Sequence, residues 1–201
     1  MDFDRVSQRL QDLGYKVSCF ETAAEAAEYL NNQIDGQTVG FGGSVTLPDM
    51  GLYDSLSAHN QVVWHWRVPE GKTADDMRRE AAAAQVYISS VNGLAETGEI
   101  INIDGNGNRL ASMLYGHEKV WFVVGENKLA PDYESALYRA RNTAAPLNAK
   151  RLGSKTPCAV SGDRCYNCQS PGRICRALSV LWASPRSCAF EVVLIHESLG
   201  F

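Results

Sequence analysis

Short apolar segments alternate along the chain with longer amphipathic segments, and this alternation constrains the fold more than any other feature of the sequence. Strands are expected at residues 15–20, 37–43, 61–66, 86–93, 98–104 and 119–125 and within 188–201, and helices at 2–13, 23–34, 51–60, 72–85 and 132–152. Two neighbouring parallel strands must be joined by a crossover connection, and a helix of about ten or more residues is long enough to form one. The pattern therefore predicts an α/β fold with a largely parallel sheet that is covered by helices on both faces.

Two of the expected helices carry local signals that bear on where they begin or end. Thr22 is expected to cap the helix at 23–34, with Glu25 as its partner in a capping box. In the segment 132–152, Pro146 is expected to interrupt or end the helix, because proline lacks a backbone donor and clashes with the preceding turn.

Composition limits the size of the protein and its partners. The chain has 201 residues, of which 45% are hydrophobic and 21% charged, so a single domain spanning 1–201 is expected. A net charge of -4 without a basic run argues against nucleic-acid binding. The sequence shows no secretory signal and no stretch of about 18 apolar residues. We therefore expect a cytoplasmic location and no membrane span. Cytoplasmic thiols stay reduced, which favours metal ligation over disulfides.

Four cysteines gather in a segment rich in Gly, Ser and Pro at residues 153–175, which is expected to form a loop or small lobe within the domain. Six, two and six residues separate the successive members of this set, which is Cys158, Cys165, Cys168 and Cys175. Four thiolates can hold a 4Fe-4S cluster, whose ligands tolerate uneven spacing. Structural zinc usually takes two close pairs, and only one is present. A 4Fe-4S cluster is the preferred cofactor, with zinc or no metal as alternatives.

Three basic residues flank these thiols: Arg164, Arg173 and Arg176. Positive charge near the thiols stabilises thiolates and offsets the charge of an anionic cluster. Two further cysteines, Cys19 and Cys188, fall in expected strands and are interpreted as small buried hydrophobic residues.

A glycine-rich loop follows the expected strand at 37–43. Gly42 and Gly43 allow backbone N–H groups to approach a ligand, and Ser44 and Thr46 add hydroxyl donors, which suits a small anion such as a carboxylate or phosphate. The alternative is a tight turn that needs glycine for a positive φ. His65 ends a nearby strand and could line such a pocket, although a half-buried structural histidine is the preferred interpretation.

The segment 92–109 is the densest polar stretch outside the cysteines. Asn92, Asp104, Asn108 and Arg109 are candidate ligand-binding residues, and the Arg109 fork suits a substrate carboxylate. Local Asx turns would explain the Asn and Asp residues without any ligand.

Several motifs in order resemble the lactate-utilization (LUD) domain family, in particular short stand-alone members with a C-terminal four-cysteine motif. They are VGFGGSVTLPDMGLYDSL, SSVNGLAETGEIINIDGNGNRLASMLYGHEKVWFVVGENK, ARNTAAPLNAKRL and the segment from PCAVSGDRCYNCQSPGRIC to VVLIHESLGF. The resemblance implies a Rossmann-like three-layer fold, similar to sugar-phosphate isomerases and CoA transferases. It implies a link to oxidation of L-lactate to pyruvate, with iron–sulfur or flavin-type partner subunits. By position, it also makes Glu96 a loose candidate for a catalytic nucleophile.

Two functions are consistent with these features. The first is an iron–sulfur-binding redox component of lactate oxidation. The second is an accessory or regulatory module that binds a small anion, with structural zinc in the cysteine loop. An independent dehydrogenase is disfavoured, because GFGGSV lacks the third glycine of a dinucleotide fingerprint.

Overall fold

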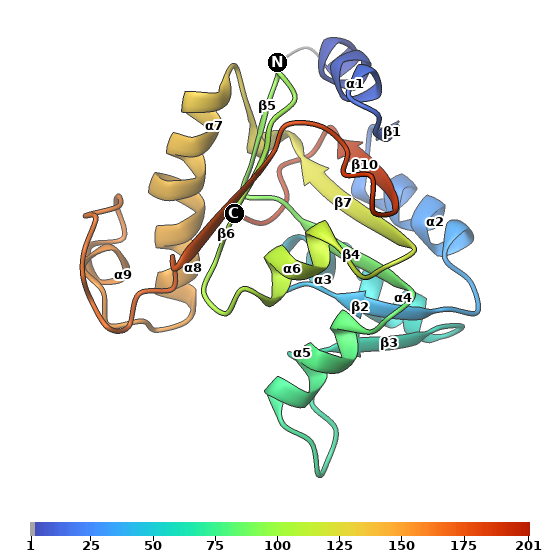
Figure 1. The fold of residues 1–201 in the computed structure, drawn as a ribbon, viewed down its shortest axis with the longest axis horizontal. Coiled ribbons are helices and arrows are strands. Elements are labelled where there is room, and N and C mark those ends of the chain that lie inside the picture. The colour runs from blue at the N-terminus through green and yellow to red at the C-terminus, as the bar shows by residue number, and fades with distance from the viewer. Residues whose placement is uncertain (1–2) are drawn as a thin grey trace.

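A six-stranded sheet forms the centre of the computed structural model, which describes residues 3–201 (Figure 1). All of its neighbouring strands are parallel, as the alternation of strands and helices predicted. The strands, in spatial order, are β1 (Lys16–Phe20), β10 (Ala189–Ile195), β7 (Lys119–Gly125), β4 (Val86–Ser90), β2 (Thr38–Phe41) and β3 (Gln61–Trp64).

Helices cover both faces of this sheet. Residues alternate along the central strand β7, so that Trp121 and Val123 pack on one face while Phe122 and Val124 pack on the other. Three helices cover the first face: α2 (Ala23–Gln33), α3 (Thr46–Asp49) and α4 (Leu52–Ser57). The second face carries α1 (Phe3–Asp12), α5 (Ala74–Ala82) and α6 (Asn108–Leu114). The expected α/β three-layer arrangement is confirmed, and no helix within 3–201 is long and apolar enough to cross a bilayer.

The predicted capping box is present at the start of α2. Thr22 Oγ1 accepts from the N–H of Glu25, and the Glu25 carboxylate accepts from the N–H of Thr22. A second capping box, formed by Thr73 and Asp76, begins α5.

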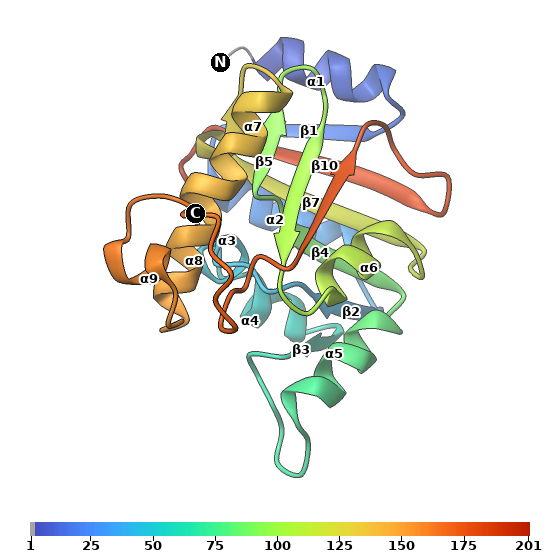
Figure 2. The same ribbon diagram turned by 60° about the vertical axis from the view of Figure 1, so that its left-hand side comes forward.

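A second, mixed sheet lies over the second face of the first, and the sequence analysis did not foresee it (Figure 2). After β4 the chain turns at Asn92 and pairs again, where the sequence pattern suggested that a single strand simply ends. Gly93 permits this, because a Cβ there would lie 2.6 Å from the carbonyl oxygen of Ala136 in the helix above. The strands, in spatial order, are β8 (Leu129–Ala130), β5 (Gly93–Ala95), β6 (Ile100–Asp104) and β9 (Ala177–Leu181).

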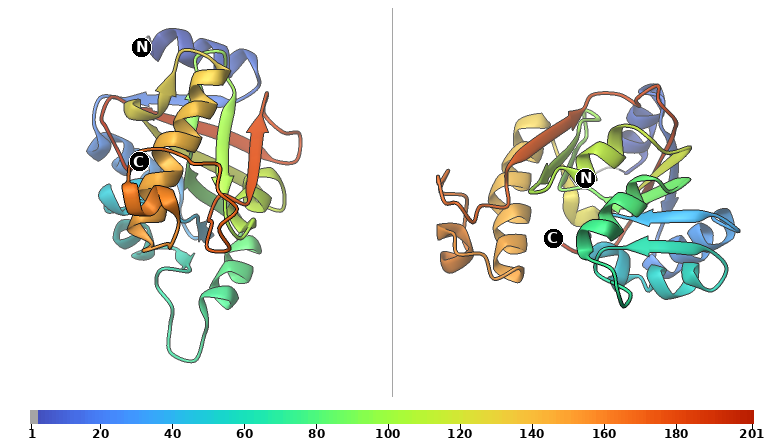
Figure 3. Two further views of the ribbon diagram at one scale, coloured as in Figure 1. Left: turned by 90° about the vertical axis from the view of Figure 1, so that its left-hand side faces the viewer. Right: turned by 60° about the horizontal axis from the view of Figure 1, so that its bottom comes forward.

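Pro146 does not end its helix, but the regular α-helix is interrupted directly before it, as one of the two predicted outcomes had it. The helix runs from α7 (Tyr133–Arg139) through a π-helical turn (Ala140–Ala144) into α8 (Ala145–Arg151), and the proline lies at the start of α8. A π turn widens the helix and shifts its hydrogen bonding, so the missing donor and the bulk of the proline ring are accommodated without a break. Figure 3 shows α7 and α8 as one rod beside the sheets.

The cysteine-rich segment 153–175 forms a lobe on the outer side of α8 (Figure 3). Its only regular element among the described residues is the short helix α9 (Pro157–Ser161). The N–H of Arg176, which follows the lobe, donates to the carbonyl of Asp104 and so fastens this end of the lobe to β6.

The two cysteines outside the lobe are less buried than predicted. Cys19 is exposed, because it lies on β1 at the edge of the main sheet, so its assignment as a buried hydrophobic residue is wrong. Cys188 is half-buried and lies one residue before β10 begins.

A buried carboxylate fixes three neighbouring strands against one another. Glu191 in β10 has no exposed surface, and it accepts hydrogen bonds from Tyr29 (2.7 Å), Ser18 (2.8 Å) and Lys119 (2.8 Å). The ammonium group of Lys16 lies 3.1 Å away on β1. Burial works against the charge, but these hydrogen bonds together hold the pKa of Glu191 below its ordinary value.

We expect Glu191→Gln to lower the free energy of unfolding at pH 7 by about 3 kcal/mol, because it removes the negative charge that compensates two lysines. The stabilisation by Glu191 is present above the ordinary glutamate pKa and is lost as the pH falls through the lowered one. The difference between variant and wild type should therefore shrink in acid, as measured by urea unfolding. Glu118→Gln, at an exposed position nearby, is the control and should change little; equal stability of both variants would contradict the account.

Candidate functional site

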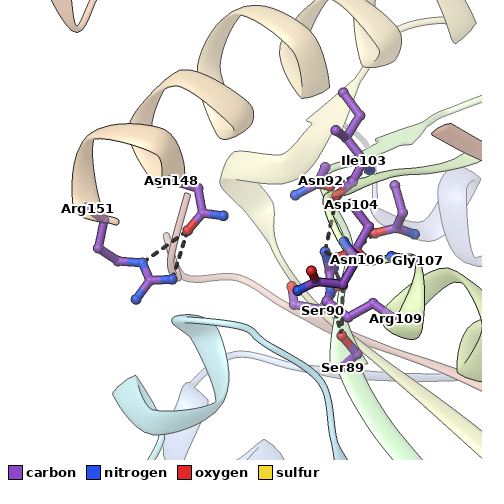
Figure 4. Close-up of polar contacts among 11 residues, drawn as sticks. Ser89, Ser90, Asn92, Ile103, Asp104, Asn106, Gly107, Arg109, Asn148 and Arg151 are labelled. Carbon is purple, nitrogen blue, oxygen red and sulfur yellow. Dashed lines mark hydrogen bonds and ion pairs between the residues drawn. The ribbon is translucent and has the colours of Figure 1, made fainter. Parts of the chain in front are cut away.

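A cavity of about 420 Å³ opens at the carboxyl ends of the parallel strands. Ser44, Ser90 and Lys128 line it from the segments at or after the ends of β2, β4 and β7, and Arg151 lines it from α8. Figure 4 shows Arg151 and Asn148 on α8 facing the residues at the strand ends across this space. Ligands of open α/β sheets bind at this edge, so the position is that of a binding site.

Arg109 forms part of the wall and joins the two sheets (Figure 4). Its Nη2 donates to the carbonyl of Ser90 (3.0 Å) at the end of β4 and to Asn102 Oδ1 (3.3 Å) on β6. Its Nη1 donates to the carbonyl of Ile103 (3.3 Å) and lies 3.8 Å from the carboxylate of Asp104. Most of its donors are therefore engaged within the protein, so it contributes charge and rigidity, and its predicted bidentate grip on a substrate carboxylate stays a prediction.

Lys128 is the functional candidate that the sequence analysis missed. Its side chain is 3% exposed, and Nζ donates to the hydroxyls of Thr46 (2.9 Å) and Ser90 (2.8 Å). No carboxylate within residues 3–201 lies within 4 Å of it as an ion-pair partner. Burial, helped by the charges of Arg139 and Arg109, lowers the pKa of Lys128 to about 7. The available signal was its place just after the strongest strand of the sequence.

Positive charge dominates the cavity wall. Six basic side chains line it: Arg78, Arg109, Lys128, Arg151, Arg173 and Arg176. Asp104 is the only carboxylate side chain among the described lining residues. A wall of this composition favours an anionic ligand.

The glycines after β2 allow close packing, and the alternative interpretation, a turn that needs a positive φ, does not apply to them. Neither Gly42 nor Gly43 has a positive φ. A Cβ on Gly42 would collide with the side chain of Ser89, and one on Gly43 would lie 3.3 Å from the ring of His65. Gly43 and Ser44 line the cavity as predicted for an anion loop. Thr46 is fully buried, and its hydroxyl accepts a hydrogen bond from the ammonium group of Lys128.

The Asx-turn interpretation of the polar segment holds at Asp104. Its Oδ2 accepts from the N–H groups of Asn106 and Gly107, so it shapes the turn before α6 as well as lining the cavity. Asn92 and Asn108 also line the cavity, and Asn92 Oδ1 accepts from the N–H of Ile103. The structure thus brings most of the predicted ligand-binding residues to one place.

His65 is half-buried and also lines the cavity, so both roles suggested for it by the sequence, structural and pocket-lining, are compatible. Burial, followed by the charge of Arg78, lowers the pKa of His65 to about 4. The imidazole is therefore neutral at pH 7 and adds no positive charge to the wall.

Glu96 lies elsewhere. It occupies the turn between β5 and β6, where its carboxylate is 4.0 Å from Arg5 of α1. It lines neither this cavity nor the one at the cysteines. Its assignment as a nucleophile stays a prediction that this position does not favour.

All four lobe cysteines line a second cavity of about 240 Å³. They are Cys158, Cys165, Cys168 and Cys175, and all are free thiols. No three His, Cys, Asp or Glu side chains in the described part of the chain are grouped so as to hold a single metal ion. The donor set nevertheless fits a larger thiolate-bound group, because four soft ligands share one space.

Hydrogen-bond donors surround these sulfurs. Arg173 Nη2 donates to Cys175 Sγ (3.4 Å), and the N–H of Asn167 donates to Cys165 Sγ (3.4 Å). Arg173 also donates to the carbonyls of Cys168 and Cys175. Such donors stabilise thiolates and the clusters that they bind.

The two cavities share a wall. Arg173 lines both of them, and so do Ile103, Ala145, Ile174 and Arg176. The cysteine lobe therefore reaches the basic cavity, and Arg173, whose guanidinium donates to Cys175 Sγ, belongs to the lining of both cavities.

One solved structure covers nearly the whole chain with a similar fold. A DUF162 family protein from Deinococcus radiodurans is 15% identical and aligns over 96% of this chain and 95% of its own, with a TM-score of 0.56. Ribose 5-phosphate isomerase from Plasmodium falciparum is 14% identical over 54% of this chain and 52% of its own, with a TM-score of 0.34. The sequence has no significant match among curated proteins.

The family comparison agrees with the motifs of the sequence. The model of the LUD domain matches residues 3–195, which is nearly the whole chain. The resemblance inferred from the sequence is thereby confirmed, and the chain belongs to the LUD domain family, which is linked in general to lactate utilization.

Proposed function

We propose that the chain is an iron–sulfur-binding component of a system that oxidises L-lactate to pyruvate, in which a 4Fe-4S cluster lies beside an anion-binding cavity. The observation that carries this proposal is the shared wall: four thiols line one cavity, and Arg173 lines both that cavity and its basic neighbour. A redox group and a bound anion would then be close enough to influence each other.

A cluster fits the cysteine cavity better than zinc does. Four sulfurs around one zinc ion lie about 3.8 Å apart, since each Zn–S bond is about 2.3 Å long. The thiols of residues 3–201 are not grouped around one such point, yet all four line the same space. Cys158, Cys165, Cys168 and Cys175 would hold the cluster, which would supply reversible one-electron transfer when bound.

The remaining chemistry of lactate oxidation belongs to a partner. Conversion of lactate to pyruvate removes two electrons and two protons, and the sequence carries no flavin or nicotinamide fingerprint. The proposal therefore includes an iron–sulfur or flavin-type partner subunit that exchanges electrons with this chain.

We expect about four irons and four acid-labile sulfides per chain after anaerobic purification, with a visible absorption band that dithionite bleaches. Cys168→Ser should abolish most of the iron and the band, because it removes one of four ligands. Cys19→Ser, which changes an exposed thiol outside the lobe, is the matched control and should keep both. One zinc per chain with no sulfide would instead identify a structural clamp and defeat the redox proposal.

We expect Lys128→Met to raise the free energy of unfolding of the ligand-free chain by on the order of 2 kcal/mol at pH 6, despite the loss of two hydrogen bonds. The folded pKa of about 7 lies below the unfolded one, so the cost of burying the charge is fully present below pH 7 and fades as the pH rises toward about 10. Urea unfolding at several pH values measures this, with the exposed Lys155→Met as control. Destabilisation by Lys128→Met at every pH would show that the lysine is structural.

A further inference from the structure

We propose that the basic cavity binds a small molecule that carries two or more negative charges, such as a phosphate ester or a polycarboxylate, and not the monoanion L-lactate. The inference deepens the proposed function and rests on one part of it, namely that this cavity binds an anion. It does not depend on which metal the cysteines hold.

The charge of the wall is too large for a monoanion. Six basic side chains face one carboxylate side chain among the described lining residues. His65 is neutral, so it does not alter this balance. Arg78 pairs with Asp75 and Arg109 lies near Asp104, which leaves four cations without a carboxylate partner among the described residues: Lys128, Arg151, Arg173 and Arg176. A ligand with a single negative charge would leave most of these four uncompensated in a partly closed space, where charges of the same sign repel more strongly than in water. Two or more negative charges on the ligand would relieve this repulsion.

The cations stand on opposite sides of the cavity. Lys128 follows the end of β7, and the guanidinium of Arg109 reaches the end of β4 from α6, whereas Arg151 faces them from α8 (Figure 4 shows Arg109 and Arg151). Arg173 and Arg176 approach from the segment that links the cysteine lobe to β9. A ligand with anionic groups at two points can contact both sides at once, and a single carboxylate cannot.

Two of the cations have capacity to bind a ligand. The Lys128 ammonium has three donors and gives hydrogen bonds to two neutral hydroxyls, so one donor and the whole charge are uncompensated. Arg78 lines the cavity and pairs with Asp75 through Nη1, and its Nη2 has no hydrogen-bond partner among residues 3–201. A donor left without a partner is costly, and a ligand oxygen would satisfy it.

The size of the cavity agrees with the charge. A volume of about 420 Å³ corresponds to on the order of fourteen water molecules at their volume in the liquid. L-lactate has six non-hydrogen atoms and would fill only part of it. In this account lactate is oxidised on the partner subunit, and the cavity of this chain holds a larger polyanion.

The test is isothermal titration of the purified chain, as isolated, with three probes at one ionic strength and pH 7: inorganic pyrophosphate, citrate and L-lactate. We expect one of the two polyanions to bind at least about tenfold more tightly than L-lactate. Tighter binding of pyrophosphate identifies a phosphate ligand, and tighter binding of citrate a polycarboxylate. Equal or tighter binding of L-lactate, or no binding of either polyanion, would overturn the inference.

Variants of two basic residues that line the cavity, and of one that does not, test whether the cavity is the binding site. Arg78→Gln and Lys128→Met should each weaken binding of the preferred polyanion about tenfold. Arg79→Gln alters the next residue of α5, which is exposed and outside the cavity lining, and should stay within about twofold of wild type. Thermal unfolding of each variant establishes that it is folded. Unchanged affinity in both cavity variants, or an equal loss in Arg79→Gln, would place binding elsewhere.

Iron and sulfide measured on the same samples separate this inference from the proposed function. Polyanion binding without iron leaves the inference intact and defeats the iron–sulfur proposal. Iron and sulfide without polyanion binding would support the iron–sulfur proposal and overturn the inference.

Discussion

The hydrogen bonds of Arg109 hold the functional region together. One guanidinium reaches the carbonyl of Ser90 on the main sheet and the side chain of Asn102 and carbonyl of Ile103 on the second sheet. Much of the remaining contact between the two sheets is made by apolar side chains, which fix distance more than orientation. The cavity lies where these two sheets and α8 come together, so its shape depends on this contact.

Two buried charged residues, Glu191 and Lys128, differ in how well their charges are compensated. Glu191 is surrounded by donors and cations, whereas the hydrogen-bond partners of Lys128 within residues 3–201 are two hydroxyls. The first arrangement stabilises the sheet, and the second leaves a buried positive charge without a compensating carboxylate. Buried polar groups that lower stability mark functional sites in many proteins, and Lys128 fits that rule here.

The sequence predicted what depends on local pattern and missed what depends on distant contacts. The six strands of the main sheet follow from short apolar runs and the Thr22 cap from a local motif, and both were predicted correctly, whereas β5, β8, β9 and the helices α3, α6 and α9 were not predicted. The second sheet was not predicted, because β9 pairs with β6 across more than seventy residues, and its short apolar run ALSVL carries no local sign of that partner. An interruption at Pro146 was predicted, but its form, a π turn, has no local signature, and Lys128 was missed because its partners lie far away in the chain.

The central claim is that the cysteine lobe and the basic cavity work as one unit through Arg173, which lines both. Electron paramagnetic resonance of the dithionite-reduced protein tests it most directly, with spectra taken without and with a saturating amount of the tighter-binding polyanion. The account predicts a change in the spectrum, because an anion in the basic cavity would alter the hydrogen bond of Arg173 to Cys175 Sγ. Identical spectra would contradict it and would mean that the two cavities, although adjacent, act independently.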